Sequence, residues 1–147
     1  MESKVVCEVL LNSYKHLEKL CKRCDEAVLT LATNSYNNDI FEVFDMIAKF
    51  SNQKNVYCNI KLVIDKAISK LKKNTELKYR YILGLRNIEI QKMLGLTQPV
   101  VTKRINSQKE KLFEYLQNKY TEEQLFDFIK DSIPLMEQYR RLCNENN

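Results

Sequence analysis

Apolar residues recur at alternating intervals of three and four residues along the first part of the chain. The residues of this stripe are Cys7, Leu10, Tyr14, Leu17, Cys21, Cys24, Val28 and Leu31. This is the spacing of a coiled coil, and it places all of them on one side of a helix that is about 36 Å long at about 1.5 Å per residue. We therefore predict a long N-terminal helix whose stripe needs a partner, either a later helix of the same chain or a second subunit in a homodimer.

The scarcity of turn residues extends this prediction to the whole chain. Its 147 residues contain only two Gly and two Pro, too few for the turns of a many-stranded sheet. An apolar content of 44% is enough for a buried core. The sequence thus predicts an all-α fold.

Three segments follow from the pattern of loops and helices. Residues 1–73 form an N-terminal helical segment for dimerisation or partner binding, 74–118 a helix-turn-helix domain, and 119–147 a C-terminal helical extension. Within the first segment we expect loops at 33–38 and 51–55.

Local signals define the expected helices more closely. The 33–38 loop ends at Asn38 or Asp39, either of which can cap an amphipathic helix to Phe50. Further helices are expected at 56–71, from Asn74 or Thr75 to Gly84, and from Thr121, where Gln124 completes a capping box. Pro134 predicts a kink or break in this last helix.

Positive charge is concentrated in the middle of the chain. Residues 54–111 contain 14 Lys or Arg against four Asp or Glu, whereas the whole chain carries a net charge of +5. Such clustering is typical of a surface that neutralises phosphates, although lysines on solvated helix faces give a similar pattern.

A helix-turn-helix framework lies inside this basic segment, over Asn87 to Lys111. Its structural residues are Ile90, Leu94, Gly95, Leu96, Val101 and Ile105. Gly95 suits the tight turn, and Leu96 fills the angle between the two helices. Thr97 stands where an N-cap belongs and Pro99 lies in the first turn, so both predict that the second helix begins near Gln98.

The second helix then presents one polar face outward. With Val101 and Ile105 buried, Pro99, Lys103 and Asn106 lie at the centre of the exposed side. The predicted DNA-binding residues are Thr97, Gln98, Pro99, Val100, Thr102, Lys103, Arg104, Asn106 and Ser107. Lys103 can donate to guanine or phosphate and Asn106 can bond adenine, while Gln98 and Arg104 suit phosphates.

The remaining reactive residues indicate no second chemistry. Cys21 and Cys24 fall on the apolar stripe and find no second pair of ligands, so packing is favoured over a metal site. His16, the single histidine, has no nearby nucleophile or paired acid. We predict no catalytic residue, no metal and no cofactor. The odd count of five Cys, the absence of a leader and the lack of a long apolar run predict a cytoplasmic protein with no membrane contact.

Two stretches of the basic segment share a family pattern: Tyr79-Arg80-Tyr81-Ile82-Leu83-Gly84-Leu85 and Leu94-Gly95-Leu96-Thr97-Gln98-Pro99-Val100-Val101-Thr102-Lys103-Arg104-Ile105, with Ile88-Glu89-Ile90 between them. Together they resemble region 4 of the sigma-70 family, and more narrowly the ArpU-type regulators of phages and prophages. The similarity extends from Tyr79 to Leu112, about a quarter of the chain. It implies a sequence-specific, double-stranded DNA-binding transcriptional regulator of phage, prophage or mobile-element origin, which reads the major groove and contacts RNA polymerase.

Some positions depart from the family pattern. Arg86 replaces the usual capping Ser or Thr, so Asn87 is expected to take over the cap. Gln108 and Lys109 replace apolar residues, which predicts looser helix packing. The alternative function is a helical protein-interaction module, for example one that binds RNA polymerase without binding DNA itself.

Overall fold

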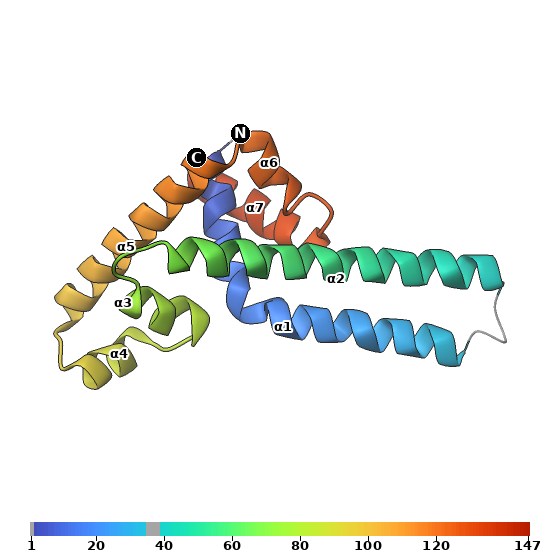
Figure 1. The fold of residues 1–147 in the computed structure, drawn as a ribbon, viewed down its shortest axis with the longest axis horizontal. Helices are drawn as coiled ribbons and strands as arrows, with labels where there is room; N and C mark the ends of the chain where they lie inside the picture. The colour runs from blue at the N-terminus through green and yellow to red at the C-terminus, as the bar shows by residue number, and fades with distance from the viewer. Residues whose placement is uncertain (1, 35–38) are drawn as a thin grey trace.

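The described residues, 2–34 and 39–147 of a computed structural model, confirm the all-α prediction and contain no strand. The helices are α1 (Ser3–Thr33), α2 (Ile40–Ser69), α3 (Thr75–Leu77), the π-helical turn η2 (Lys78–Ile82), α4 (Asn87–Leu94), α5 (Gln98–Lys119), α6 (Glu122–Asp127) and α7 (Ile133–Glu145). Figure 1 shows α1 and α2 as a long antiparallel hairpin, with the other helices gathered at one end of it. Across these residues, no helix combines the length and the apolar character that a membrane span requires.

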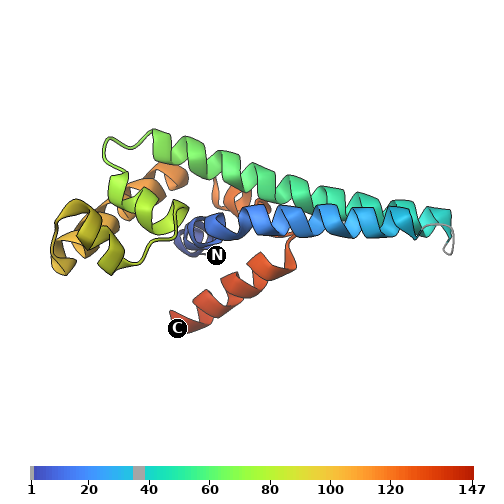
Figure 2. The same cartoon turned by 90° about the horizontal axis from the view of Figure 1, so that it is seen from below.

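The predicted stripe of α1 finds its partner within the same chain. Cys7, Leu10, Leu17 and Cys24 are buried in a core that α2 shares, and the other members of the stripe are half-buried. Figures 1 and 2 both show the two helices side by side. A homodimer through this stripe would therefore require the hairpin to open.

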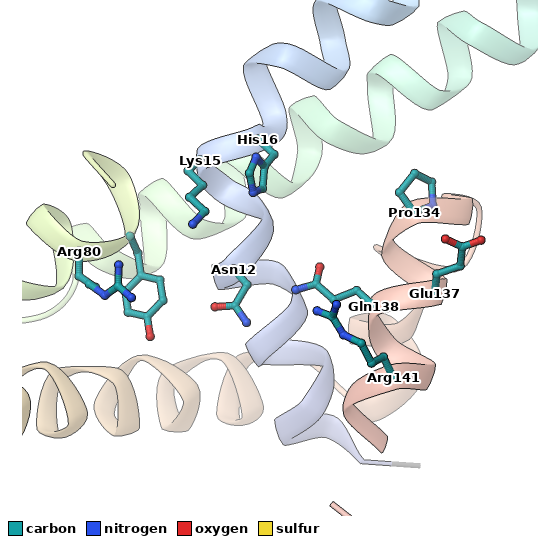
Figure 3. A pocket seen from close by; sticks show the side chains of 9 residues that line it. Asn12, Lys15, His16, Arg80, Pro134, Glu137, Gln138 and Arg141 are labelled. Atoms are coloured by element: carbon teal, nitrogen blue, oxygen red, sulfur yellow. The ribbon is translucent and has the colours of Figure 1, made fainter. Parts of the chain in front are cut away.

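Helix α1 is bent rather than straight. Figures 1 and 3 show it changing direction where Lys15 and His16 lie. Just before this point the buried Ser13 hydroxyl donates to the Leu10 carbonyl at 2.9 Å. A side chain that bonds back to the preceding turn competes with the backbone ladder and bends a helix. The bend lets the N-terminal arm of α1 reach α5, α6 and α7.

The prediction of a loop at 51–55 was wrong, because α2 continues through these residues. The segment contains no Gly or Pro, and its polar residues lose only tenths of a kcal/mol in a helix, about 0.7 at most. Packing against α1 outweighs that cost. Phe50, Val56 and Tyr57 contact the core, and Lys54 pairs with Asp25 of α1 at 2.8 Å.

Asn52→Pro tests the continuity of α2. A proline here removes one backbone hydrogen bond and clashes with the preceding turn, so the free energy of unfolding should fall by about 3 kcal/mol. Asn52 is exposed, and Asn52→Ala should change stability little. Urea denaturation compares the two variants. Equal stabilities would mean that the segment is a loop after all.

Helix α2 begins at Ile40, directly after one of the two predicted capping residues. The Asp39 side chain accepts a hydrogen bond from the Phe41 amide at 2.8 Å, which confirms Asp39 as the cap. The alternative cap, Asn38, lies outside the described residues. Near this end of the hairpin the structure exposes large apolar side chains of the amphipathic helix that was predicted to end at Phe50. Ile40 is 55% exposed, Phe41 75% and Phe44 59%.

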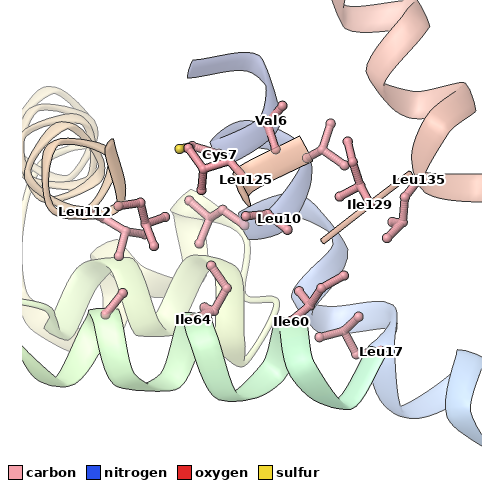
Figure 4. Close-up of a cluster of buried hydrophobic side chains, with 14 of the residues drawn as sticks. Val6, Cys7, Leu10, Leu17, Ile60, Ile64, Leu112, Leu125, Ile129 and Leu135 are labelled. Carbon is pink, nitrogen blue, oxygen red and sulfur yellow. The ribbon is translucent and has the colours of Figure 1, made fainter. Parts of the chain in front are cut away.

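Two apolar clusters hold the fold together. The larger one joins residues from all three predicted segments, and Figure 4 shows Leu10, Ile60, Leu112 and Leu125 converging on it from four helices. The smaller cluster centres on three buried residues, Ile90, Val101 and Ile105. Helix α5 contributes to both clusters, so it ties the α4–α5 unit to the hairpin.

The C-terminal segment begins as the sequence predicts. The Thr121 side chain accepts from the Gln124 amide and the Gln124 side chain from the Thr121 amide, which confirms the capping box. A break follows, but it precedes Pro134 instead of falling on it. Helix α7 starts at Ile133, so Pro134 lies in its first turn, where a missing N–H has no cost.

Candidate nucleic-acid interface

A short turn joins α4 to α5. Gly95 adopts φ 65°, a left-handed conformation that favours glycine, and it ends α4 as a C-cap. Ile90, Val101 and Ile105 are buried between the two helices, while Leu94 and Leu96 pack on them half-buried. The apolar residues of this set form the smaller cluster, and Gly95 ends α4 beside it.

The start of α5 also falls at the predicted residue. Thr97 has the extended backbone of an N-cap, and Pro99 lies in the first turn. The Thr97 carbonyl accepts from the Val101 amide at 3.1 Å, but its hydroxyl makes no capping hydrogen bond. The outward-facing amides at this end of α5 are thus left available to a ligand.

The prediction that Asn87 caps α4 was wrong. Arg86 occupies the N-cap position, and its carbonyl accepts from the Ile90 amide at 3.1 Å. Its side chain pairs with Glu89 at 2.7 Å. Asn87 is the first helical residue, and its side-chain oxygen is buried with no hydrogen-bond partner. The Arg86 carbonyl also accepts from the Glu89 amide at 3.0 Å, so this first-turn amide is satisfied without a side-chain cap.

All the predicted DNA-binding residues are exposed on α5 or at its N-cap. A shallow depression of about 720 Å³ runs along the helix. Its lining contains Gln98, Pro99, Thr102, Lys103, Asn106 and Ser107, together with Glu110. Glu110 was not among the predicted residues. Its carboxylate can accept from a cytosine amino group and repels phosphate, so it restricts what this face can contact.

A second, positively charged cleft of about 710 Å³ lies beside this face. The connection from α2 to α3 brings Lys72 and Lys73 against the side of α5 that carries Lys103, Arg104 and Lys111. Figure 1 shows this connection curving past α5. By sequence, Lys72 and Lys73 end a helix, where they could be solvated or graze the DNA backbone. Spacing along the chain does not reveal that α5, about thirty residues further on, lies beside them.

The acid in this cleft is Glu76, which is already engaged. Its carboxylate accepts from Gln108 Nε2 at 2.6 Å and from the Arg104 guanidinium at 3.2 Å. The side-chain oxygen of Gln108, Oε1, in turn accepts a hydrogen bond from the Leu77 backbone amide at 2.9 Å. Arg104, predicted to contact phosphate, therefore also has a structural role, although its side chain remains 51% exposed.

Gln108 and Lys109, which were expected to loosen the helix packing, both contact neighbouring helices. Gln108 is 6% exposed and bonds α5 to α3. Lys109 pairs with Glu8 of α1 at 2.6 Å and lies over the rings of Tyr81 and Phe113. Both polar residues thus link α5 to other helices, Gln108 to α3 and Lys109 to α1.

The buried Glu76 predicts acid sensitivity. Burial alone would raise the pKa of its carboxyl, but the hydrogen bonds from Gln108 and Arg104 hold the pKa below its ordinary value of 4.5. Because the folded-state pKa is lowered, the ionised carboxylate stabilises the fold at pH values above 4.5. This stabilisation is lost as the pH falls through the folded-state pKa. Glu76→Gln should remove this component, so urea unfolding of variant and wild type should differ most at neutral pH and converge below pH 4.5. A difference that is independent of pH would contradict this role.

Cysteine thiols of α1 have raised pKa values. Burial raises the pKa of the Cys7 thiol to about 12, and burial beside Cys58 raises that of Cys21 to about 11. Such thiols are poor nucleophiles and poor metal ligands. Within residues 2–34 and 39–147, no three His, Cys, Asp or Glu side chains lie close enough to hold a metal ion.

The described chain is therefore an all-helical protein with an exposed polar helix beside a basic cleft. No family model, no curated protein and no solved structure matches it.

Proposed function

We propose that this protein binds double-stranded DNA through a helix-turn-helix formed by α4 and α5. The observation that carries the proposal is the basic cleft, in which Lys72 and Lys73 lie against the exposed face of α5. Helix α5 is about 33 Å long, and its N-terminal half projects beyond the larger core. A single helix of this kind fits the major groove.

The two parts of the surface suit two tasks. Lys103, Asn106 and Val100 face outward and can read a guanine, an adenine and a thymine methyl respectively. Lys72, Lys73 and Lys111 flank them and can neutralise the phosphates of the adjoining backbone. One set of side chains would then position the protein on the DNA backbone, and another would recognise the base sequence.

The resemblance to sigma region 4 and ArpU-type proteins supports the more specific proposal of a transcriptional regulator from a phage, prophage or mobile element. In that role α5 would read promoter DNA, and RNA polymerase would be a protein partner. The paired core residues Ile90 and Val101 and the turn at Gly95 are the features that support it.

In vitro selection from a random duplex library tests the proposal directly. The expected result is one enriched motif that fits a single major-groove helix, followed by a steep loss of affinity with added salt in fluorescence anisotropy. Failure to enrich any sequence, together with no binding to duplex DNA at low salt, would exclude it.

A second candidate function is protein interaction, with RNA polymerase as the partner. The observation that favours it is the apolar end of the hairpin, where Leu29 is 67% and Phe41 75% exposed. Exposed apolar patches mark interaction sites on soluble proteins. Comigration with purified RNA polymerase in gel filtration, without retention of DNA, would favour this function over DNA binding.

A further inference from the structure

A separate cleft of about 640 Å³ opens where α1, η2 and α7 meet. Figure 3 shows side chains from the three elements around it, with Arg80 on one side of α1 and Gln138 and Arg141 on the other. The bend in α1 brings Asn12, Lys15 and His16 between them. Cavities of about 300–1,000 Å³ are typical of small-ligand sites.

The charge of this cleft is strongly biased. Lys15, Arg80 and Arg141 supply three permanent positive charges, and Glu137 is the one acid in the lining. In Figure 3 Glu137 lies at the outer edge beside Pro134, whereas the Arg141 guanidinium is turned toward Asn12 and Gln138. The two amides add hydrogen-bond donors to the cationic ones.

These cations are poorly neutralised within the protein. Across the described residues Lys15 takes part in no ion pair. Arg80 donates to the Leu85 carbonyl at 3.3 Å, and Arg141 meets Glu145 at 3.9 Å. Three like charges that line one cleft repel one another, so an anion bound between them is favoured.

We propose that this cleft binds a small phosphate-bearing anion, with Lys15, Arg80 and Arg141 holding its phosphate oxygens. Guanidinium groups bind phosphate through paired N–H donors, and an ammonium group adds a point charge. Tyr81 supplies an aromatic wall on which an organic group can pack. This site goes beyond DNA binding and does not depend on it. Figure 2 shows α7 on the side of the molecule opposite the α2–α3 connection that carries Lys72 and Lys73.

Calorimetric titration of the full chain with sodium tripolyphosphate and with ATP, at fixed ionic strength, tests the proposal. Both should bind wild type, and the double variant Lys15→Gln, Arg141→Gln should bind at least about tenfold more weakly because two charge-assisted contacts are lost. The matched control is Lys49→Gln, Arg140→Gln, which removes two exposed positive charges outside the cleft and should bind as wild type. Arg141→Gln alone gives the same comparison if the double variant is less stable.

Each outcome has a definite meaning. If ATP binds more tightly than tripolyphosphate, the ligand is a nucleotide. If the two bind equally, the cleft recognises the phosphate chain alone. Both results support the site. No binding of either anion, or equal weakening in the control variant, overturns it. The proposal also fails if neither anion binds and the Lys15, Arg141 variant instead loses affinity for duplex DNA, since the cleft would then belong to the DNA-binding surface.

Discussion

Replacing Lys72, Lys73 and Lys111 with Gln is expected to weaken binding to all duplex DNA alike. Each lysine in the cleft can displace one condensed counterion, so the slope of log affinity against log salt should become shallower by about 2.7 for the three. The loss of affinity should therefore be large at low salt and small at high salt. Anisotropy measured over a salt series gives both quantities.

Replacing Lys103 and Asn106 with Ala should act differently. Both side chains lie on the outward face of α5, where they can contact base edges, and each such contact is worth about 1–3 kcal/mol of discrimination. The variant should therefore lose its preference for the selected sequence while keeping most of its non-specific affinity. Because both residues are exposed, helicity by circular dichroism should not change.

The contrast between the two variants is the informative result. If the cleft variant alone loses sequence preference, the assignment of reading and positioning residues is reversed. If neither variant changes DNA binding, α5 is not the DNA-binding helix. The Lys49→Gln, Arg140→Gln variant serves again as a control, since it lowers the net charge at two exposed positions outside the basic cleft beside α5.

Leu112→Ala should destabilise the whole chain by about 2–5 kcal/mol. Leu112 is fully buried where α5 enters the larger cluster, as Figure 4 shows, and truncation there leaves a cavity. Helix α5 also carries the smaller cluster, so both should unfold in one transition. Urea denaturation followed by circular dichroism measures the change.

The exposed Leu62 provides the matched control for this prediction. It is 67% exposed on α2, so Leu62→Ala should alter the free energy of unfolding by no more than about 0.5 kcal/mol. Equal effects at the two positions would contradict the assignment of Leu112 to the core. Two separate transitions in the Leu112 variant would show that the α4–α5 unit folds independently of the hairpin.

Much of the fold follows from signals that act within a few residues. The lack of Gly and Pro and the spacing of the stripe predict long helices, because both act on the backbone of one segment. Thr97 with Pro99 and Thr121 with Gln124 mark where α5 and α6 begin, since these residues favour the first turn of a helix. The outward face of α5 is predictable for the same reason.

The sequence misled where a contact between distant segments outweighed a local preference, as at residues 51–55. Residues 51–55 look like a loop by composition, yet the pairing of Lys54 with Asp25 and the packing of Tyr57 keep them helical. Arg104 and Gln108 look like surface residues of α5, but Glu76, from a segment about thirty residues earlier, engages both. No spacing rule within one helix contains that information.

The sequence by itself therefore determined the all-helical class, the start of α5 and the residues on its outward side. Only the tertiary structure decided that the stripe of α1 packs against α2, that Lys72 and Lys73 lie beside α5, and that a bend in α1 opens the cleft near Arg80. The physical reason is that helix formation and capping depend on neighbours three or four residues away, whereas clefts and ion pairs form between segments that only folding brings together.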